Sequence, residues 1–204
     1  MAVALSAFLP FILPQCANCP DVTAEHNVLQ AVIELCKKSL VWREFQTAQT
    51  TQASVTNYPY TPAAGQVVHK LLGVKLAGSL IEAVDAARGQ AFDDSSELRP
   101  YAYGLVSSYE LRPAQTAGIT VQTYAAVHPS QAATTVPDWM LDKYAEQIAT
   151  GALYRLHGHI GRDYAQPAMV AGELALWNGA IDDIRIEAFK AHARSFPRVR
   201  ASWF

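Results

Sequence analysis

The sequence contains little cysteine, and what it has is poorly placed for covalent cross-links. Only three of the 204 residues are cysteine, at Cys16, Cys19 and Cys36. A small odd number does not build the disulfide framework of a secreted domain. Cys16 and Cys19 form one Cys-x-x-Cys pair, without a second pair for zinc or the strand and helix of a redox motif. We therefore expect no zinc or redox site, and a core position for Cys36.

The chain also lacks a large excess of either positive or negative charge. The chain has 16 Lys and Arg residues against 18 Asp and Glu residues, which gives a formal net charge of −2. A protein that holds nucleic acid by its phosphates needs a basic field, and this chain as a whole does not carry one. We therefore expect any passage of double-stranded DNA along this protein to be passive.

Long apolar runs are absent as well. No segment reaches about 18 uninterrupted apolar residues, so we expect no membrane contact. The opening residues, MAVALSAFLPFILPQ, resemble the apolar region of a secretory signal, but no Lys or Arg precedes that region and Pro10 and Pro14 interrupt it. We expect no export. We interpret residues 1–20 as an extended apolar arm that packs on its own subunit or on a neighbour, because that much apolar surface is a liability in water.

Three segments carry the pattern of helices in a chain whose residues are 50% hydrophobic. Residues 21–43 follow Pro20 and have two adjacent apolar stripes, which predicts a helix buried on more than one side. A second helix begins near Pro137 and stops at Gly158 in a left-handed conformation. The third, at about 166–192, is roughly 40 Å long. Its buried seam repeats at helical spacing and comprises Val170, Leu174, Trp177, Ile181, Ile184, Ala188 and Ala191.

Residues 45–129 read differently, because they are rich in Thr, Val, Tyr and Gln with frequent Pro and Gly. This composition favours strands separated by turns. The segment 79–88 is a short helix or a loop, and its alanines favour the helix. The expected strands are 45–51, 53–58, 66–76, 101–111 and 119–127.

The order of these segments predicts an α+β protein in which a β excursion interrupts a helical group. We expect a helical bundle of about three helices with an inserted antiparallel β region and a long C-terminal helix. The expected parts are an N-terminal arm at 1–20, a helical core at 21–44 and 134–193, an inserted β region at 45–133 and a C-terminal tail at 194–204.

No motif for catalysis or for a cofactor is present. The sequence contains no glycine-rich phosphate loop, nucleophile elbow or HExxH pattern, so we expect no enzyme and no cofactor. The best chemical candidate is His157, His159 and Asp163, two imidazoles and a carboxylate that could hold a metal ion. The alternative, which we favour, is that these polar residues cap helix ends in the turn of a helical hairpin.

The last eleven residues, RSFPRVRASWF, alternate arginines with aromatic residues. Pro197 prevents a simple continuation of the preceding helix. Arginine and aromatic side chains anchor protein interfaces, although a frayed basic tail is the alternative. We interpret this segment as a docking peptide that enters a cleft on a partner. Its anchor residues are Arg194, Phe196, Arg198, Arg200, Trp203 and Phe204.

The order and spacing of the helical segments resemble a known family. The segments are CPDVTAEHNVLQAVIELCKKSLVWRE, then VPDWMLDKYAEQIATGALYRL and YAQPAMVAGELALWNGAIDDIRIEAF after the β region. They are similar to the adaptor proteins of the head-to-tail connector in tailed bacteriophages. The likeness rests on Ser39 to Trp42 at the end of the first helix, Gly151 to Leu153 in the second, and Tyr164 with Pro167 before the third. It covers both ends of the chain, roughly half its length.

This resemblance implies a structural virion protein, made in the host cytoplasm and located in the neck between capsid and tail. It implies a homo-oligomeric ring, usually of about twelve copies, that lies beneath the portal protein, contacts tail or nozzle proteins and lets DNA pass. It also implies that the C-terminal segment binds clefts of the portal. A closed ring needs two different complementary faces on each subunit. The residues expected at the subunit interface are Phe8, Phe11, Gly172 and Gly179.

Two other functions stay open. The same composition fits another virion part, such as a tail completion or terminator protein. A metal-dependent enzyme that uses His157, His159 and Asp163 is the remaining alternative.

Overall fold

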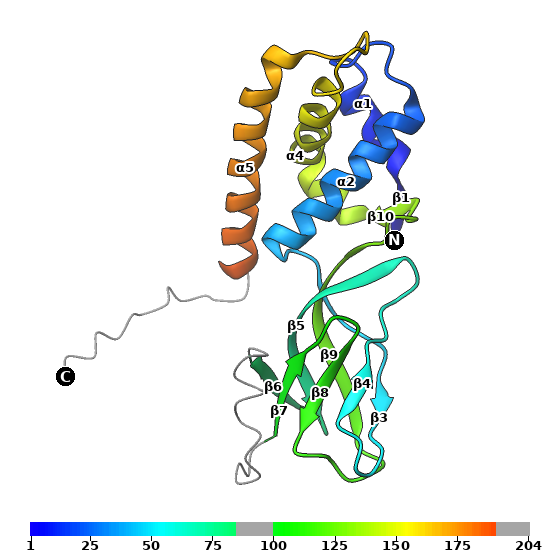
Figure 1. The fold of residues 1–204 in the computed structure, drawn as a ribbon, viewed down its shortest axis with the longest axis vertical. Coiled ribbons are helices and arrows are strands. Elements are labelled where there is room, and N and C mark those ends of the chain that lie inside the picture. The colour runs from blue at the N-terminus through cyan, green and yellow to red at the C-terminus, as the bar shows by residue number, and fades with distance from the viewer. Residues whose placement is uncertain (85–99, 191–204) are drawn as a thin grey trace, which may run out of the picture. The chain divides into compact units, whose positions relative to one another are not determined.

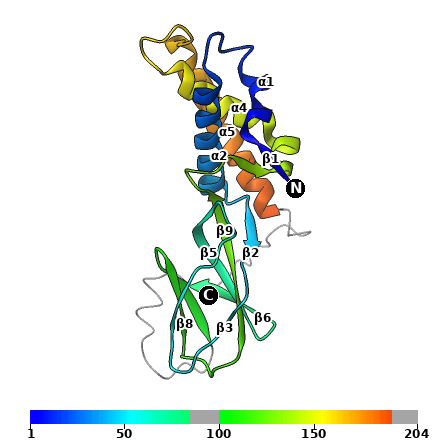
Figure 2. The ribbon, with the colours of Figure 1, turned by 90° about the vertical axis from the view of Figure 1, so that its right-hand side faces the viewer.

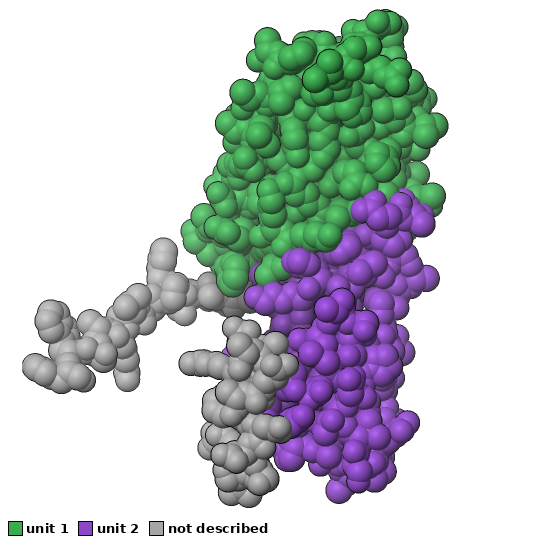
Figure 3. Space-filling view, viewed as in Figure 1, with its two compact units in different colours: residues 1–41, 134–204 green, residues 42–133 purple. Residues whose placement is uncertain are grey.

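The computed structural model describes residues 1–84 and 100–190. The chain divides into two compact units, which are coloured separately in Figure 3. Unit 1 consists of Met1–Val41 and the chain from Thr134 onward, and unit 2 consists of Trp42–Ala133. Each unit therefore has its own core, and unit 1 is assembled from two segments that lie far apart in the sequence.

Unit 1 is mainly helical. Helices α2, α4 and α5 pack against one another in pairs, and both views of the ribbon show them side by side (Figures 1 and 2). Helix α2 begins directly after Pro20 and ends where Leu40 takes a left-handed conformation. The elements of unit 1 are β1 (Ala2–Ala4), a 3-10 helix (Leu5–Phe8), α1 (Leu9–Ile12), α2 (Asp21–Ser39), β10 (Thr135–Pro137), α4 (Asp138–His157) and α5 (Pro167–Lys190).

The N-terminal residues are not an extended arm. Strand β1 pairs antiparallel with β10, with Val3 opposite Val136, and the Met1 ammonium lies 3.3 Å from the Asp138 carboxylate. The following 3-10 helix and α1 bury Phe8 and Ile12 completely in unit 1. The apolar side chains of this segment are thus largely hidden within their own unit, which removes most of the exposed surface that the sequence indicated.

Unit 2 is a large curled sheet in which eight strands are paired, counting the part of the chain that the structure describes. The path runs β2-β9-β5-β6-β7-β8-β4, and β3 also pairs with β9. Two register shifts between β5 and β9 mark bulges, which increase the local twist and bend a sheet. The strands are β2 (Arg43–Phe45), β3 (Gln49–Thr50), β4 (Asn57–Pro59), β5 (Gln66–Leu76), β6 (Ser79–Val84), β7 (Tyr101–Gly104), β8 (Ser108–Arg112) and β9 (Thr120–Pro129).

Aromatic residues fill the core of unit 2. The ring of Tyr109 is fully buried, and its centroid lies 5.8 Å from those of Tyr58 and Tyr60. Leu111 and Val121 are also completely buried in this cluster. Offset aromatic pairs at this separation add to the hydrophobic stabilisation of a core. The sheet therefore has a hydrophobic core of its own.

The predicted fold class is wrong. The chain is a mixed α/β protein, mainly β, with four helices among the described residues and one large curled sheet. It is not a helical bundle with a small antiparallel insert. The sheet is also not purely antiparallel, because β6 and β7 pair in parallel. Local sequence patterns predict individual strands, but they do not show which strands pair. The large sheet depends on pairing between strands that are far apart in the sequence.

Several local predictions also need correction. Residues 79–84, expected as a helix or loop, form strand β6 because they pair with β5. The expected strand 101–111 is a hairpin of β7 and β8. Gly158 ends α4 with a φ of −77°, so it is not in the left-handed region. In the first two cases backbone pairing overrides local propensity.

Two helical glycines provide a matched test of packing in unit 1. A Cβ atom on Gly151 would lie 2.9 Å from atoms of the Trp177 ring, whereas a Cβ on Gly172 meets nothing within 4 Å. We expect Gly151→Ala to lower the free energy of unfolding by about 1–3 kcal/mol through overpacking. We expect Gly172→Ala to raise it by about 0.5–1 kcal/mol, because alanine favours helix. Chemical denaturation measures both changes, and a stabilised Gly151→Ala variant would contradict the close packing.

Candidate subunit interface

Helix α5 presents an uncharged outer face along its first half. Between Pro167 and Ile181 the only charged residue is Glu173, and its side chain is buried. Two large side chains on this stretch, Met169 and Leu176, are 51% and 69% exposed. Exposed apolar residues that share one face of a helix mark an interaction site more often than singly scattered ones do. The exposed residues of this outer face are Met169, Gly172, Ala175, Leu176 and Gly179, whereas Leu174 lies on the opposite flank of the helix.

The opposite face of α5 is fixed in unit 1 by close packing. Trp177 is fully buried, and Ile181 and Ile184 are 4% exposed. The Trp177 ring lies against Gly151 of α4, at a distance that leaves no room for a Cβ atom there. Glycine at this position therefore permits the close approach of the two helices. Because one face of α5 is tightly packed, the direction of its outer face is also set.

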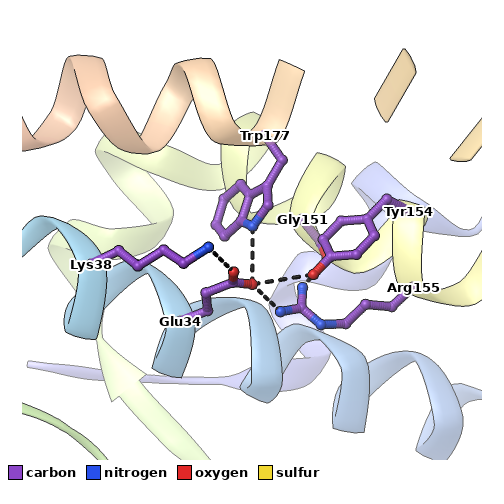
Figure 4. Close-up of polar contacts among 6 residues, drawn as sticks. All are labelled: Glu34, Lys38, Gly151, Tyr154, Arg155 and Trp177. Carbon is purple, nitrogen blue, oxygen red and sulfur yellow. Dashed lines mark hydrogen bonds and ion pairs between the residues drawn. The ribbon is translucent and has the colours of Figure 1, made fainter. Parts of the chain in front are cut away.

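The carboxylate of Glu34 on α2 connects the three long helices (Figure 4). Trp177 of α5 donates its indole N–H to Oε2 at 3.1 Å, and the Tyr154 hydroxyl of α4 lies 3.2 Å from the same oxygen. Arg155 also donates to Oε2, and the ammonium of Lys38 lies 2.5 Å from Oε1. Hydrogen bonds between charged partners are stronger than neutral ones. This carboxylate is therefore the polar centre of unit 1.

The environment of Glu34 decides its protonation. Burial acts to raise the pKa of this carboxyl, but the bonds from Lys38, Trp177 and Arg155 outweigh that effect and lower the pKa from 4.5 to about 2. The carboxylate is consequently charged over the whole neutral and mildly acidic range. An ionised partner for Arg155 is thus maintained between the helices.

A groove of about 440 Å³ lies beside the outer face of α5 and is bounded by α1 and α4. Its apolar part includes Phe11, which is 40% exposed, and the side chains of Met169 and Leu176. Its polar part includes the carboxylates of Glu146 and Glu173. The described residues that line this groove include no Lys, Arg or His. The groove therefore offers an apolar surface with acidic groups, which suits a partner that has both apolar and cationic side chains.

His157 and Glu173 form a buried pair next to this groove. The His157 side chain is 1% exposed, and its Nδ1 lies 2.9 Å from each oxygen of the Glu173 carboxylate. Its Nε2 lies 3.3 Å from the carbonyl oxygen of Gln15. The pair thus connects the last residue of α4 to α5 and to the segment after α1. Sequence spacing gives no indication of this pair, because its two residues lie 16 positions apart on different helices.

The structure does not bring the candidate metal ligands together. His157 faces Glu173, whereas His159 lies 3.2 Å from the Tyr164 hydroxyl, and Asp163 is exposed. Across residues 1–84 and 100–190 no group of three His, Cys, Asp or Glu side chains is arranged to hold a metal ion. The described cysteines are free and buried. Burial raises the pKa of Cys16 to about 12, so its thiol stays protonated at neutral pH.

The residues expected at the subunit interface have different environments. Gly172 and Gly179 lie on the outer face of α5, and Phe11 lines the groove. Phe8 is completely buried within unit 1 and presents no surface to a neighbour, so we leave it out of the candidate interface. The expected docking residues lie outside the described part of the chain; they are Arg194, Phe196, Arg198, Arg200, Trp203 and Phe204.

Four residues of this region were not predicted from the sequence: Met169, Leu176, Glu34 and Glu173. Leu176 and Met169 lie outside the predicted buried seam of α5, although the uncharged run from 167 to 181 is visible in the sequence. Glu34 was overlooked because a single glutamate in a helix is usually solvated. Leu174, expected in the buried seam, is 37% exposed. The seam is formed instead with Glu173, because its partner His157 makes burial of that carboxylate possible.

We expect Glu34→Gln to destabilise the protein by about 2 kcal/mol, since Arg155 would lose its ionised partner in a partly buried site. Glu25→Gln is the matched control, because it makes the same change on the same helix at a residue with no ion pair among the described ones. Denaturation midpoints at neutral pH measure the difference. Equal stability of the two variants would show that the Glu34 cluster contributes little.

The same cluster predicts a pH dependence. The pKa of Glu34 is lower in the folded chain than its ordinary value, so the stabilisation is present above about pH 4.5 and is lost as the pH falls towards about 2. Thermal unfolding between pH 6 and pH 2 tests this expectation. The wild-type chain should lose stability more steeply in this window than Glu34→Gln, and parallel curves would contradict the assignment.

A scan against protein-family models finds no match, and a search of curated proteins finds none either. No helix in the described part of the chain is long and apolar enough to cross a membrane. The function is therefore argued from this chain's own residues and from the resemblance of its helical segments.

Proposed function

We propose that this chain is a structural virion protein, an adaptor subunit of a bacteriophage head-to-tail connector. In this proposal its copies form a ring of about twelve beneath the portal protein, join it to tail or nozzle proteins and let DNA pass. The observation that carries the proposal is the uncharged outer face of α5. The opposite face of the same helix is tightly packed in unit 1. The resemblance of the helical segments to connector adaptors supports the same role.

The outer face of α5 is suited to the close approach of a second copy. Gly172 and Gly179 lie seven residues apart, about two helical turns, so they are on the same side. Apart from the nearby backbone of α5 itself, no atom of the described residues lies within 4 Å of a Cβ built on either glycine. Leu176 and Met169 provide apolar contact area beside them. In a ring this face contacts a different face of the neighbour, which is a heterologous interface.

The partners outside the ring follow from charge and from the C-terminal sequence. A net charge of −2 gives DNA no strong general attraction to the protein, which suits passive passage. The alternating arginines and aromatic residues of 194–204 suit a docking peptide on the portal. We propose no catalytic activity, no cofactor and no membrane contact for this chain.

We expect Gly179→Arg to abolish assembly while the chain stays folded, because the arginine would occupy the space where a neighbour's backbone approaches. Val22→Arg is the matched control, since Val22 is 79% exposed on α2, outside the proposed face. Mass photometry and electron microscopy with the portal protein measure ring formation, and circular dichroism checks the fold. If Gly179→Arg forms rings as readily as Val22→Arg, the α5 face is not the subunit interface.

We also expect removal of residues 194–204 to abolish binding to the portal protein of the same virus. The physical reason is the loss of the three arginine and three aromatic anchors. Co-sedimentation of the shortened chain with portal rings measures this binding. Normal binding without the tail would contradict the docking role.

The second candidate function is a different structural part of the virion, such as a tail completion or terminator protein. The same uncharged face of α5 would serve a ring in either place. Electron microscopy of the complete particle separates the two, because a connector ring lies between portal and tail, whereas a terminator ring lies on the tail tube.

A further inference from the structure

We propose that the groove between α1, α4 and α5 binds the chain's own C-terminal segment, residues 194–204, before the chain meets a partner. The groove is a hollow of about 440 Å³ in unit 1. Its occupant is the same segment that we propose to dock on the portal. The binding itself is independent of the proposed function, whereas its consequence for assembly rests on that function.

The chemistry of the segment matches that of the groove. The segment has three arginines, three aromatic side chains and no acidic side chain. The groove has the apolar side chains of Phe11, Met169 and Leu176 with two carboxylates, and no cationic residue among its described lining. Glu146 is exposed and free to meet an arginine at the rim. Oppositely charged rims fix register and orientation, while buried aromatic anchors supply the affinity.

The chain is long enough to reach the groove from the end of α5. Fourteen residues separate Lys190 from Leu176, which is about 21 Å along the helix axis. Fourteen residues also follow Lys190, and they can span up to about 46 Å when extended. A segment that turns back along α5 therefore passes Leu176 and brings Trp203 and Phe204 to the level of Met169. The segment can therefore reach the groove of its own chain without the participation of a second copy.

Occupation of the groove has a consequence for assembly. Met169 and Leu176 line the groove and also belong to the outer face of α5. A bound C-terminal segment covers both of them and obstructs the approach of a neighbouring copy. When a partner captures the segment, the face becomes free. Partner binding and ring formation would then be coupled, because the C-terminal segment cannot occupy the groove and the partner's binding site at the same time.

A photo-cross-linking experiment on the full chain tests the proposal. Trp203 is replaced by p-benzoylphenylalanine, whose ketone reacts preferentially with methionine, and the dilute protein is irradiated and mapped by mass spectrometry. The chain has three methionines. Met169 is 51% exposed in the groove, Met1 is 105% exposed elsewhere and Met140 is fully buried. Random contact would favour Met1, so the expected result is a predominant intramolecular cross-link to Met169.

A variant that places positive charge in the groove shows whether the groove is responsible. We expect Glu146→Lys combined with Leu176→Lys to lower the Met169 cross-link about tenfold, as for a tenfold loss of binding. Asp183→Lys is the matched control, because Asp183 is exposed on α5 but does not line the groove. Circular dichroism and thermal melting confirm that each variant is folded. Rings and portal binding are scored separately.

Three results would overturn the proposal. They are a cross-link to Met1 as strong as that to Met169, a Met169 cross-link that survives the double substitution, and cross-links that form only between copies. If the Met169 cross-link behaves as expected but no ring forms with the portal, the groove assignment stands and the connector function fails. If rings form and the cross-link is absent, only the groove assignment fails.

Discussion

The carboxylate of Glu34 is the interaction on which the arrangement of the long helices depends. A partly buried carboxylate is costly unless donors surround it, and here they come from Lys38, Tyr154, Arg155 and Trp177. These donors belong to α2, α4 and α5, so the charge is satisfied only when the three helices are in register (Figure 4). The outer face of α5 is exposed because its inner face is committed to this cluster.

Glycine has two opposite roles along these helices. At Gly151 the missing side chain lets Trp177 lie against α4, and a methyl group there would collide with the ring. At Gly172 and Gly179 nothing in the chain itself requires a glycine, because the space around each is open. Glycine lowers the stability of a helix, and at these two positions no packing contact within the subunit requires it. The two glycines are therefore consistent with close packing against a second subunit. This contrast connects the packing of unit 1 to the proposed ring.

The candidate interface could be predicted from the sequence only in part. Gly172 and Gly179 were expected at the interface because small residues on a helix permit close approach, and the tail was expected to dock because arginines and aromatic residues alternate in it; both stay predictions. Phe8 was expected at the interface but is buried in its own unit, because the sequence pattern of an apolar residue near the N-terminus is the same whether it packs on its own unit or on a neighbour. The groove could not be predicted at all, because it requires α1 to pack beside α4 and α5, and α1 lies far from both in the sequence.

Helix positions were within reach of sequence reasoning, since proline starts and apolar periodicity are local signals that packing did not override at α2 and α5. Strand β5 was also predictable with its observed bounds. The fold class was not, because the curled sheet depends on pairings such as β5 with β9 that close long loops. Strand β6 is fixed by its hairpin with β5 across Ala77 and Gly78. Tertiary structure decided that His157 is buried on Glu173 and which face of α5 remains exposed, since both depend on packing between different helices.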